Sequence, residues 1–251
     1  MSTLFIPTVF QAALTPMTEL VTTGCNMCTI DTAFSSPSLK CKKREVELEA
    51  RLGRVEAGSF VPGVTPAMFD SIVNKLESFQ GWAYSSEHWE TVHDYLYTVD
   101  DHVVRTRKVF LQDYPVEHIV KKRIKNVDVT CSGSPPALLN TVDIRASLST
   151  EQHVTLPEGF TVYPESTVHK LQKRFKYKDW WFIVSKTTRV NNREEETKVE
   201  AETLQVELEY QGVAEACGNL DKQQYIALGL MMKLVDFYPT FHAPYMLLPK
   251  K

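Results

Sequence analysis

Segments in which apolar and polar residues alternate constrain the fold of this 251-residue chain more than any other feature. Eight of them recur along the sequence, at residues 44–52, 88–99, 102–110, 117–124, 142–151, 168–177, 180–190 and 203–211. Successive side chains of a β-strand point to opposite faces of a sheet, so each segment predicts a strand with one apolar and one polar face. Because open sheet edges favour aggregation, antiparallel strands of this number usually close into a barrel or fold into a sandwich.

Two helices are predicted outside these strands. Thr65 can cap a helix that begins with Pro66, and apolar residues then recur at helical spacing up to Phe79. The second helix is predicted over residues 220–237. The fold class is therefore mainly β (α+β), with a few flanking helices.

The chain divides by composition near residue 40. Residues 1–40 are rich in Ser, Thr and Pro and nearly uncharged, which predicts an N-terminal arm that is poorly ordered or draped over the surface. Residues 41–251 are expected to form a single domain. The apolar run at 225–232 is far too short to span a membrane, so no membrane partner is expected. A net charge of −3 argues against a protein that coats duplex nucleic acid.

Charge is separated by strand. Carboxylates share one face of the first segment at Glu47 and Glu49, and of the last segment at Glu207 and Glu209. Bases fill the middle of the chain, where residues 105–125 carry seven Lys and Arg against two acidic residues. The alternation predicts shared faces for Arg105 with Arg107 and for Lys121 with Arg123 and Lys125. These polar faces could be solvated or could line the interior of a barrel.

An interior lined in this way would bring four glutamates together. Their repulsion is relieved by a divalent cation, and carboxylate oxygens are ligands that Mg²⁺ and Mn²⁺ prefer. Arginine and lysine on the facing strands could hold phosphate oxygens. The combination indicates metal-dependent phosphoryl chemistry.

Two motifs resemble a known family. Glu47-Leu-Glu49-Ala-Arg51-Leu-Gly53 is similar to the first strand of the triphosphate tunnel metalloenzymes, and Val206-Glu207-Leu208-Glu209 to their last metal-binding strand. The resemblance is closest to the metal-dependent RNA 5′-triphosphatases of mRNA capping of the fungal and protozoan type, in the small kinetoplastid form. It implies a closed eight-stranded antiparallel β-barrel that forms a hydrophilic tunnel, with Mn²⁺ or Mg²⁺ as cofactor.

The resemblance also implies roles for individual residues. The metal ligands would be Glu47, Glu49, Glu207 and Glu209, which would be catalytic together with Glu151, Arg105 and Arg189. Arg51 could contact substrate or pair with a neighbouring glutamate. The implied phosphate-binding residues are Arg51, Arg105, Arg107, Lys121, Arg123, Arg145, Lys170, Arg174 and Arg189.

The activity implied is removal of the γ-phosphate from the 5′-triphosphate end of nascent RNA, the first step of cap formation. The capping guanylyltransferase as partner and a nuclear location follow from the same resemblance. One alternative is a tunnel enzyme that acts on inorganic tripolyphosphate or a free nucleoside triphosphate. The other is a barrel that binds a ligand without chemistry.

Overall fold

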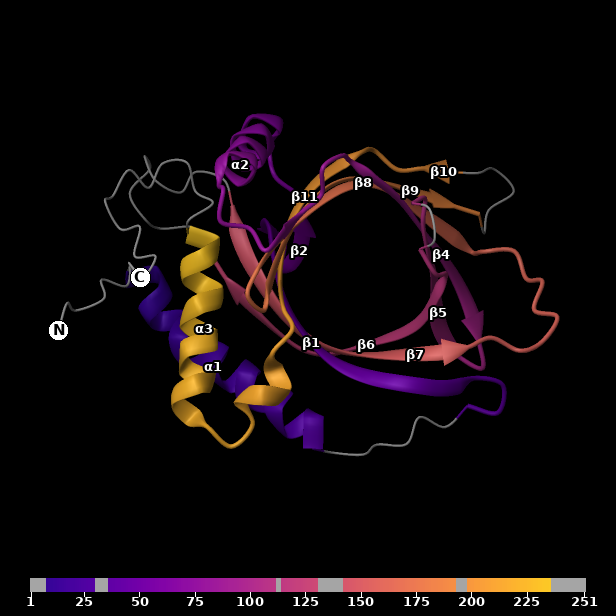
Figure 1. Cartoon of the computed structure of the whole chain (residues 1–251), viewed down its shortest axis with the longest axis horizontal. Coiled ribbons are helices and arrows are strands. Elements are labelled where there is room, and N and C mark those ends of the chain that lie inside the picture. The colour runs from indigo at the N-terminus through magenta and orange to yellow at the C-terminus, as the bar shows by residue number, and fades with distance from the viewer. Residues whose placement is uncertain (1–7, 30–35, 112–113, 131–141, 193–197, 236–251) are drawn as a thin grey trace.

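Eight antiparallel strands form a hydrogen-bonded ring, seen end-on in Figure 1. The computed structural model describes residues 8–29, 36–111, 114–130, 142–192 and 198–235. Around the ring the strands are β9 (Trp180–Asn191), β11 (Thr203–Tyr210), β1 (Lys40–Glu56), β7 (Asp143–Thr155), β6 (Glu117–Val129), β5 (His102–Val109), β4 (Glu90–Val99) and β8 (Ser166–Tyr177). Pairing of β8 with β9 completes the circuit. The eight segments predicted from alternation are confirmed as these eight strands.

Shorter elements decorate the ring. Strand β2 (Ser59–Pro62) folds back and pairs with β1. The two-residue strands β3 (Tyr84–Ser85) and β10 (Lys198–Val199) pair with β8 and β9, respectively. Helix α2 (Pro66–Ser78) begins where predicted, because the Thr65 side chain accepts a hydrogen bond from the Met68 amide. Helix α3 (Leu220–Val235) confirms the second predicted helix over the described residues. No described helix is long and apolar enough to cross a membrane.

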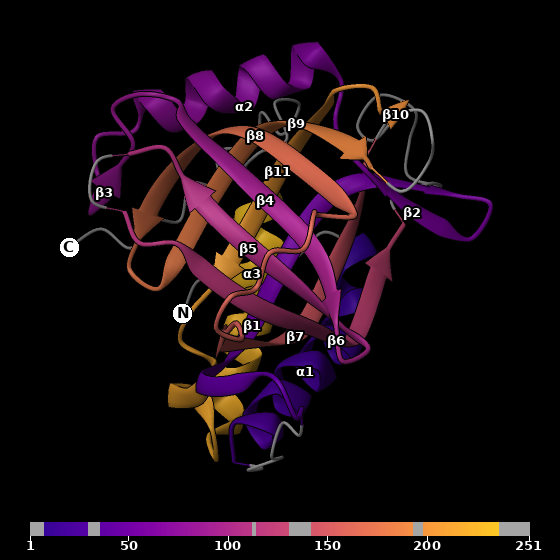
Figure 2. The same cartoon turned by 90° about the vertical axis from the view of Figure 1, so that its right-hand side faces the viewer.

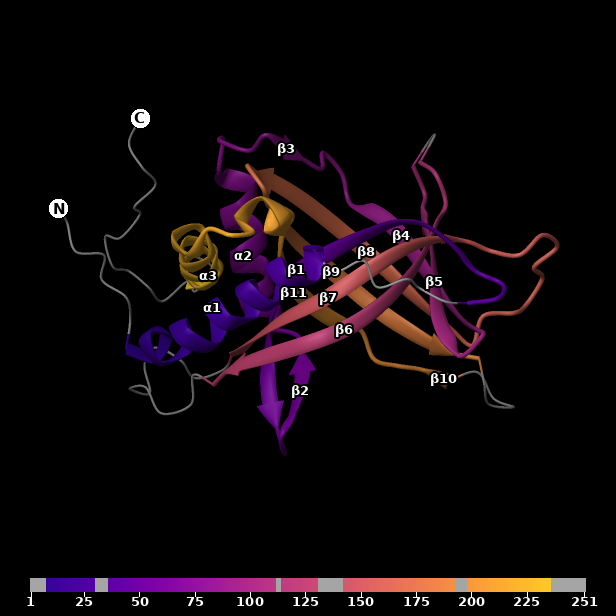
Figure 3. The same cartoon turned by 90° about the horizontal axis from the view of Figure 1, so that it is seen from below.

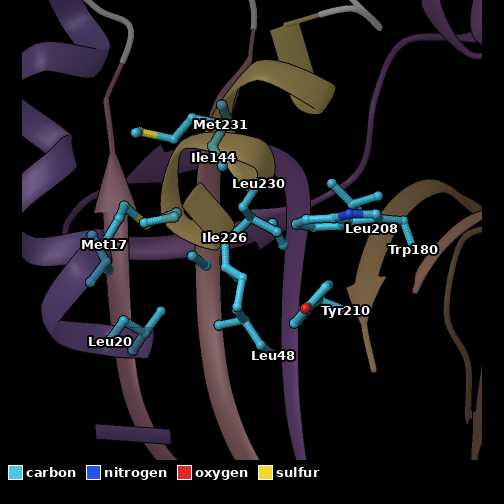
Figure 4. Close-up of a cluster of buried hydrophobic side chains, with 14 of the residues drawn as sticks. Met17, Leu20, Leu48, Ile144, Trp180, Leu208, Tyr210, Ile226, Leu230 and Met231 are labelled. Atoms are coloured by element: carbon cyan, nitrogen blue, oxygen red, sulfur yellow. The ribbon is translucent and has the colours of Figure 1, made fainter. Parts of the chain in front are cut away.

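The hydrophobic core lies outside the ring. Alternate residues of β1, including Leu48, turn outward and are buried under α3 and α1 (Thr8–Thr29), which lie side by side next to the ring. Figure 4 shows Ile226 and Leu230 of α3 in this layer. The wall formed by β4, β5 and β8 lies on the opposite side (Figure 2). The helices therefore bury the apolar faces of the strands, and the polar faces turn inward.

An arm that is poorly ordered or draped over the surface was predicted for residues 1–40, and helix α1 corrects this prediction over residues 8–29. Its side chains Met17 and Leu20 are fully buried in the core. The composition was misleading because the hydroxyls of Thr18 and Thr22 donate hydrogen bonds to carbonyls four residues earlier and so are satisfied within the helix. A Cβ at Gly24 would lie 2.9 Å from Cδ1 of Leu148, so glycine permits the close approach of helix and strand.

A β-bulge corrects the predicted face of Lys125. Lys121 and Arg123 pair with Glu151 and Ser149 of β7, but the register then shifts and Lys125 pairs with Leu148, which belongs to the outer core. Lys125 therefore leaves the interior, and its Nζ lies 3.5 Å from a carboxylate oxygen on α1. The ring interior keeps two of the three bases predicted for this face.

Replacing Leu20 tests the contribution of α1 to the core. We expect Leu20→Ala to lower the free energy of unfolding by about 2–5 kcal/mol, because the substitution leaves a cavity between helix and ring. Thr15→Ala, on the exposed face of the same helix, should change it by about 0.5 kcal/mol or less. Urea denaturation measures both values. Equal values for the two variants would contradict a structural role for α1.

Candidate metal and phosphate site

Three glutamates from two neighbouring strands form a cluster inside the ring. Glu47 and Glu49 share a face because they are two residues apart on β1, and Glu209 of β11 pairs directly with Glu49. One carboxylate oxygen from each lies within 4.8 Å of the others. The strand register alone therefore brings three carboxylates within reach of one cation.

Burial makes this cluster unfavourable when all three groups are charged. Burial raises the pKa of Glu47 to about 8 against the opposing effect of Lys121, and the charge of Glu49 adds to the rise. The pKa of Glu209 is also raised, first by burial and then by its carboxylate neighbours. Burial would raise the pKa of Glu49 too, but Arg51 and Lys121 outweigh it and hold that pKa at about 2. Positive charge therefore compensates Glu49 fully, but compensates Glu47 and Glu209 only in part.

The donor set fits a divalent cation such as Mg²⁺ or Mn²⁺. All three side chains offer carboxylate oxygens, which are hard ligands. Oε1 of Glu49 is buried and accepts no hydrogen bond from the residues that the structure describes, although Nη2 of Arg123 lies 3.7 Å away. A cation held by Glu47, Glu49 and Glu209 would satisfy this oxygen and compensate the repulsion.

Glu207, the fourth predicted metal ligand, lies outside this cluster. Its Oε1 is 3.3 Å from Nε of Arg51, whose Nη2 donates a hydrogen bond to Glu49 at 3.1 Å. Arg51 thus bridges Glu207 and Glu49, which is the pairing with neighbouring glutamates that the sequence left open. Glu207 instead lines the adjoining cavity.

A cavity of about 670 Å³ lies within the ring beside the glutamate cluster. Its charged lining comprises six bases and three acidic residues, namely Arg51, Arg105, Lys121, Arg123, Lys170 and Arg189 with Asp94, Glu200 and Glu207. All six bases belong to the predicted phosphate-binding set. The volume is in the range of small-molecule sites, and the excess of bases favours a polyanionic ligand.

Carboxylates hold the central bases in place. Lys121 contacts Glu47 and donates a hydrogen bond to Glu49 at 3.1 Å. Arg105 donates to Glu151 at 3.0 Å through Nη2. Burial opposes ionisation of Glu151, but Arg105 and Lys121 lower its pKa below the usual range. Glu151, which was predicted to be catalytic, therefore stays charged between two bases.

Asp94 is a buried site residue that the sequence did not reveal. It accepts hydrogen bonds at 2.8 and 3.1 Å from Arg107, and Nζ of Lys170 lies 3.1 Å from it. Despite burial, these two bases hold the pKa of Asp94 well below its usual range. On β4 it shares a face with the apolar residues Val92 and Leu96, so nothing in that segment marked an interior carboxylate.

Three predicted phosphate-binding arginines do not line the cavity. Arg107 is held by Asp94. Arg145 donates two hydrogen bonds of 2.7 Å to Asp128, and Arg174 donates two, of 2.9 and 3.3 Å, to Glu90. Each of these arginines is engaged by a carboxylate on a neighbouring strand.

The fold is similar to that of an RNA triphosphatase. The S. pombe protein Pct1 superposes with a TM-score of 0.63 and 18% sequence identity over 94% of both chains. A second structure, Pct1 in complex with the Spt5 CTD, gives a TM-score of 0.62 and 16% identity over the same shares. Comparison of the sequence with protein-family models and with curated proteins found no match. These likenesses establish a triphosphatase-type fold.

Asp94→Asn tests how strongly the buried carboxylate stabilises the fold. We expect a loss of about 3–5 kcal/mol in the free energy of unfolding at pH 7, because Arg107 and Lys170 lose their shared counter-charge. Asp128→Asn removes a similar but exposed pair and should cost about 1 kcal/mol or less. Urea denaturation compares the two variants.

The difference in free energy of unfolding between wild type and Asp94→Asn should depend on pH. Because the pKa of Asp94 is lower in the folded chain than in the unfolded chain, where it is about 3.9, its contribution is complete above about pH 5. The difference between wild type and Asp94→Asn should shrink as the pH falls below about 4. A difference that grows on acidification would contradict this assignment.

Proposed function

We propose that this chain is a metal-dependent RNA 5′-triphosphatase that removes the γ-phosphate from triphosphate-ended RNA. The observation that carries the proposal is a carboxylate cluster suited to Mn²⁺ or Mg²⁺ beside a cavity lined by six bases. The fold likeness to Pct1, which is an RNA triphosphatase, supports it. On this proposal the ring is a hydrophilic tunnel, and the chain acts with the capping guanylyltransferase in the nucleus.

The bases of the cavity would bind and neutralise the triphosphate. Arginine presents several donors to phosphate oxygens, and Arg105 and Arg123 keep donors free of their carboxylate contacts. Glu151 remains charged and can accept a hydrogen bond from the attacking water. A bound divalent metal would supply Lewis acidity at the terminal phosphate. Water adds to the γ-phosphorus as the bond to the bridging oxygen breaks, giving a diphosphate end and inorganic phosphate.

Two alternatives use the same site differently. A tripolyphosphatase or nucleoside triphosphatase would need the same cluster and bases, so substrate comparison must separate these activities. Triphosphate-ended RNA, tripolyphosphate and ATP are therefore assayed in parallel with one metal. A ligand-binding barrel without chemistry would release phosphate from none of them with Mg²⁺ or Mn²⁺.

Substitutions in the glutamate cluster test the proposed metal site. We expect Glu49→Gln and Glu209→Gln each to lower phosphate release from triphosphate-ended RNA by about 100-fold or more, because each removes a charged ligand. Glu45→Gln is the matched control, since Glu45 lies on the same face of β1 but outside the cluster and should leave the rate close to wild type. Calorimetry measures Mn²⁺ binding to the same two variants. Phosphate release and Mn²⁺ affinity that both stay at the wild-type level in both variants would refute the site.

A pair of arginine substitutions tests the cavity. Arg123→Ala should lower kcat/KM for triphosphate-ended RNA by about tenfold or more, because Arg123 lines the cavity. Arg145→Ala removes an arginine of the predicted set that is held by Asp128 outside the cavity, and should change kcat/KM much less. Steady-state phosphate release measures both. The opposite ranking would show that phosphate binds elsewhere.

A further inference from the structure

The two ends of the ring differ in structure and chemistry. Strands β2 and β10 lie toward one end, and β3 lies toward the other (Figure 3). The first end is where β4 and β9 finish and β5, β8 and β11 begin, so Leu96, Val103, Val168, Arg189 and Thr203 lie there. All five line the cavity, together with Val61 and Pro62 of β2. We call this end the β2–β10 mouth.

The order of residues along β11 gives the cavity a direction. From the mouth inward, Thr203, Gln205 and Glu207 line the cavity, and Glu209 of the metal cluster follows. At about 3.3 Å per residue, Glu209 is about 20 Å along the strand from Thr203. The basic lining therefore lies between the mouth and the glutamate cluster.

The mouth carries exposed apolar side chains beside Arg189 and Thr203, whereas the inner cavity is lined mainly by charged groups. Val61 and Val103 are 46% and 57% exposed although both line the cavity, and Pro62 lies beside Val61. Backbone hydrogen bonds fix the hairpin that carries Val61. The Gly63 amide donates to the Leu52 carbonyl at 3.0 Å, and the Val64 amide donates to the Leu204 carbonyl at 2.9 Å. A rigid apolar rim beyond a basic interior matches a ligand with a charged head and a less polar body, such as a nucleotide.

At the opposite end, Arg174 is already paired with a carboxylate. Glu90 is buried and accepts hydrogen bonds from Arg174 at 2.9 Å, from Ser86 at 2.8 Å and from Gln172 at 3.2 Å. Arg174 is thus compensated by a carboxylate and offers little attraction to a phosphate chain. The cavity that opens at the β2–β10 mouth instead keeps an excess of bases, six against three acidic residues, which favours binding from that mouth.

We propose that the substrate binds in one direction, with its terminal phosphate toward Glu47, Glu49 and Glu209 and its first nucleoside against Val61 and Val103. The RNA chain then leaves the ring through the β2–β10 mouth. This inference rests on the proposed function and adds a specificity surface to it. The rim valines contact the nucleoside and not the phosphates, so they matter for RNA and not for tripolyphosphate.

Valine substitutions at the two ends test the direction. Val61→Asp and Val103→Asp should raise KM for triphosphate-ended RNA about tenfold and leave KM for tripolyphosphate nearly unchanged. Val61→Ser, which adds no charge, should shift KM for RNA in the same direction. Val116→Asp is the matched control, because Val116 is 51% exposed and adjoins the start of β6 at the opposite end. It should change neither KM.

Two results would overturn the proposed direction. One is an effect on RNA from Val116→Asp that Val61→Asp and Val103→Asp lack. The other is an equal rise of KM for RNA and tripolyphosphate in the rim variants, which would show that the rim does not contact the nucleoside.

Cross-linking gives a second readout that needs no hydrolysis. Triphosphate-ended RNA with a photoreactive thio-base as its first nucleotide should label peptides that contain Val61 or Val103 in the full chain with Ca²⁺ added. Labelling of peptides that contain Tyr84 would instead reverse the direction. If wild type labels the rim but releases no phosphate from RNA with Mg²⁺ or Mn²⁺, the proposed function fails and the direction of binding stands.

Discussion

Lys121 contacts Glu47 and Glu49 of β1 and lies 3.6 Å from Glu151 of β7, and the charge balance of the ring depends on this group of contacts. Without a base at this position, buried carboxylates from adjacent strands would face one another across a few ångströms. Carboxylates in return raise the pKa of Lys121 against the effect of burial, so the lysine stays charged. Neither partner is stable inside the ring alone, which explains why the carboxylates of β11 and β1 and the bases of β6 and β5 line the same interior.

An interior filled with charge requires the apolar faces to be buried elsewhere. Helices α1 and α3 meet this requirement on one wall, and α2 buries Phe69, Ile72 and Leu76 on another. The helices thus stabilise a ring whose strands would otherwise expose their apolar faces to water. Stability and function are divided between two layers, because the site is lined from inside and the core is packed from outside.

The sequence predicted those features that follow from strict alternation. The eight strands and the shared face of Glu47 and Glu49 depend only on a period of two residues, whereas the pairing of Glu49 with Glu209 depends on a strand order that alternation does not fix. Other features depend on tertiary structure. The bulge after Arg123 breaks the period, and α1 is stabilised by contacts with β-strands far along the chain. Asp94 was missed because a single carboxylate between apolar residues on one strand face forms no recognisable sequence motif.

The sequence predicted which residue types line the site better than it predicted which of them contact one another. Glu207 shares the face of Glu209, but side-chain direction places it against Arg51, and no sequence pattern fixes such a choice. Likewise Arg145 and Arg174 have the correct parity, yet Asp128 and Glu90 engage them first. Parity tells which residues face the interior. It does not tell whether a carboxylate partner holds a base away from the cavity, as for Arg145 and Arg174, or beside it, as for Arg105 and Lys121.

The pairing of β8 with β9 leaves the eight-stranded circuit with no gap. A protein that grips nucleic acid in an open groove can bind at any point along a strand. A closed circuit around a cavity of about 670 Å³ can only be threaded, and threading needs a free terminus. On the proposed function, selection of chain ends over chain interiors would follow from topology. It would require neither base recognition nor a large positive surface, in keeping with a net charge of −3.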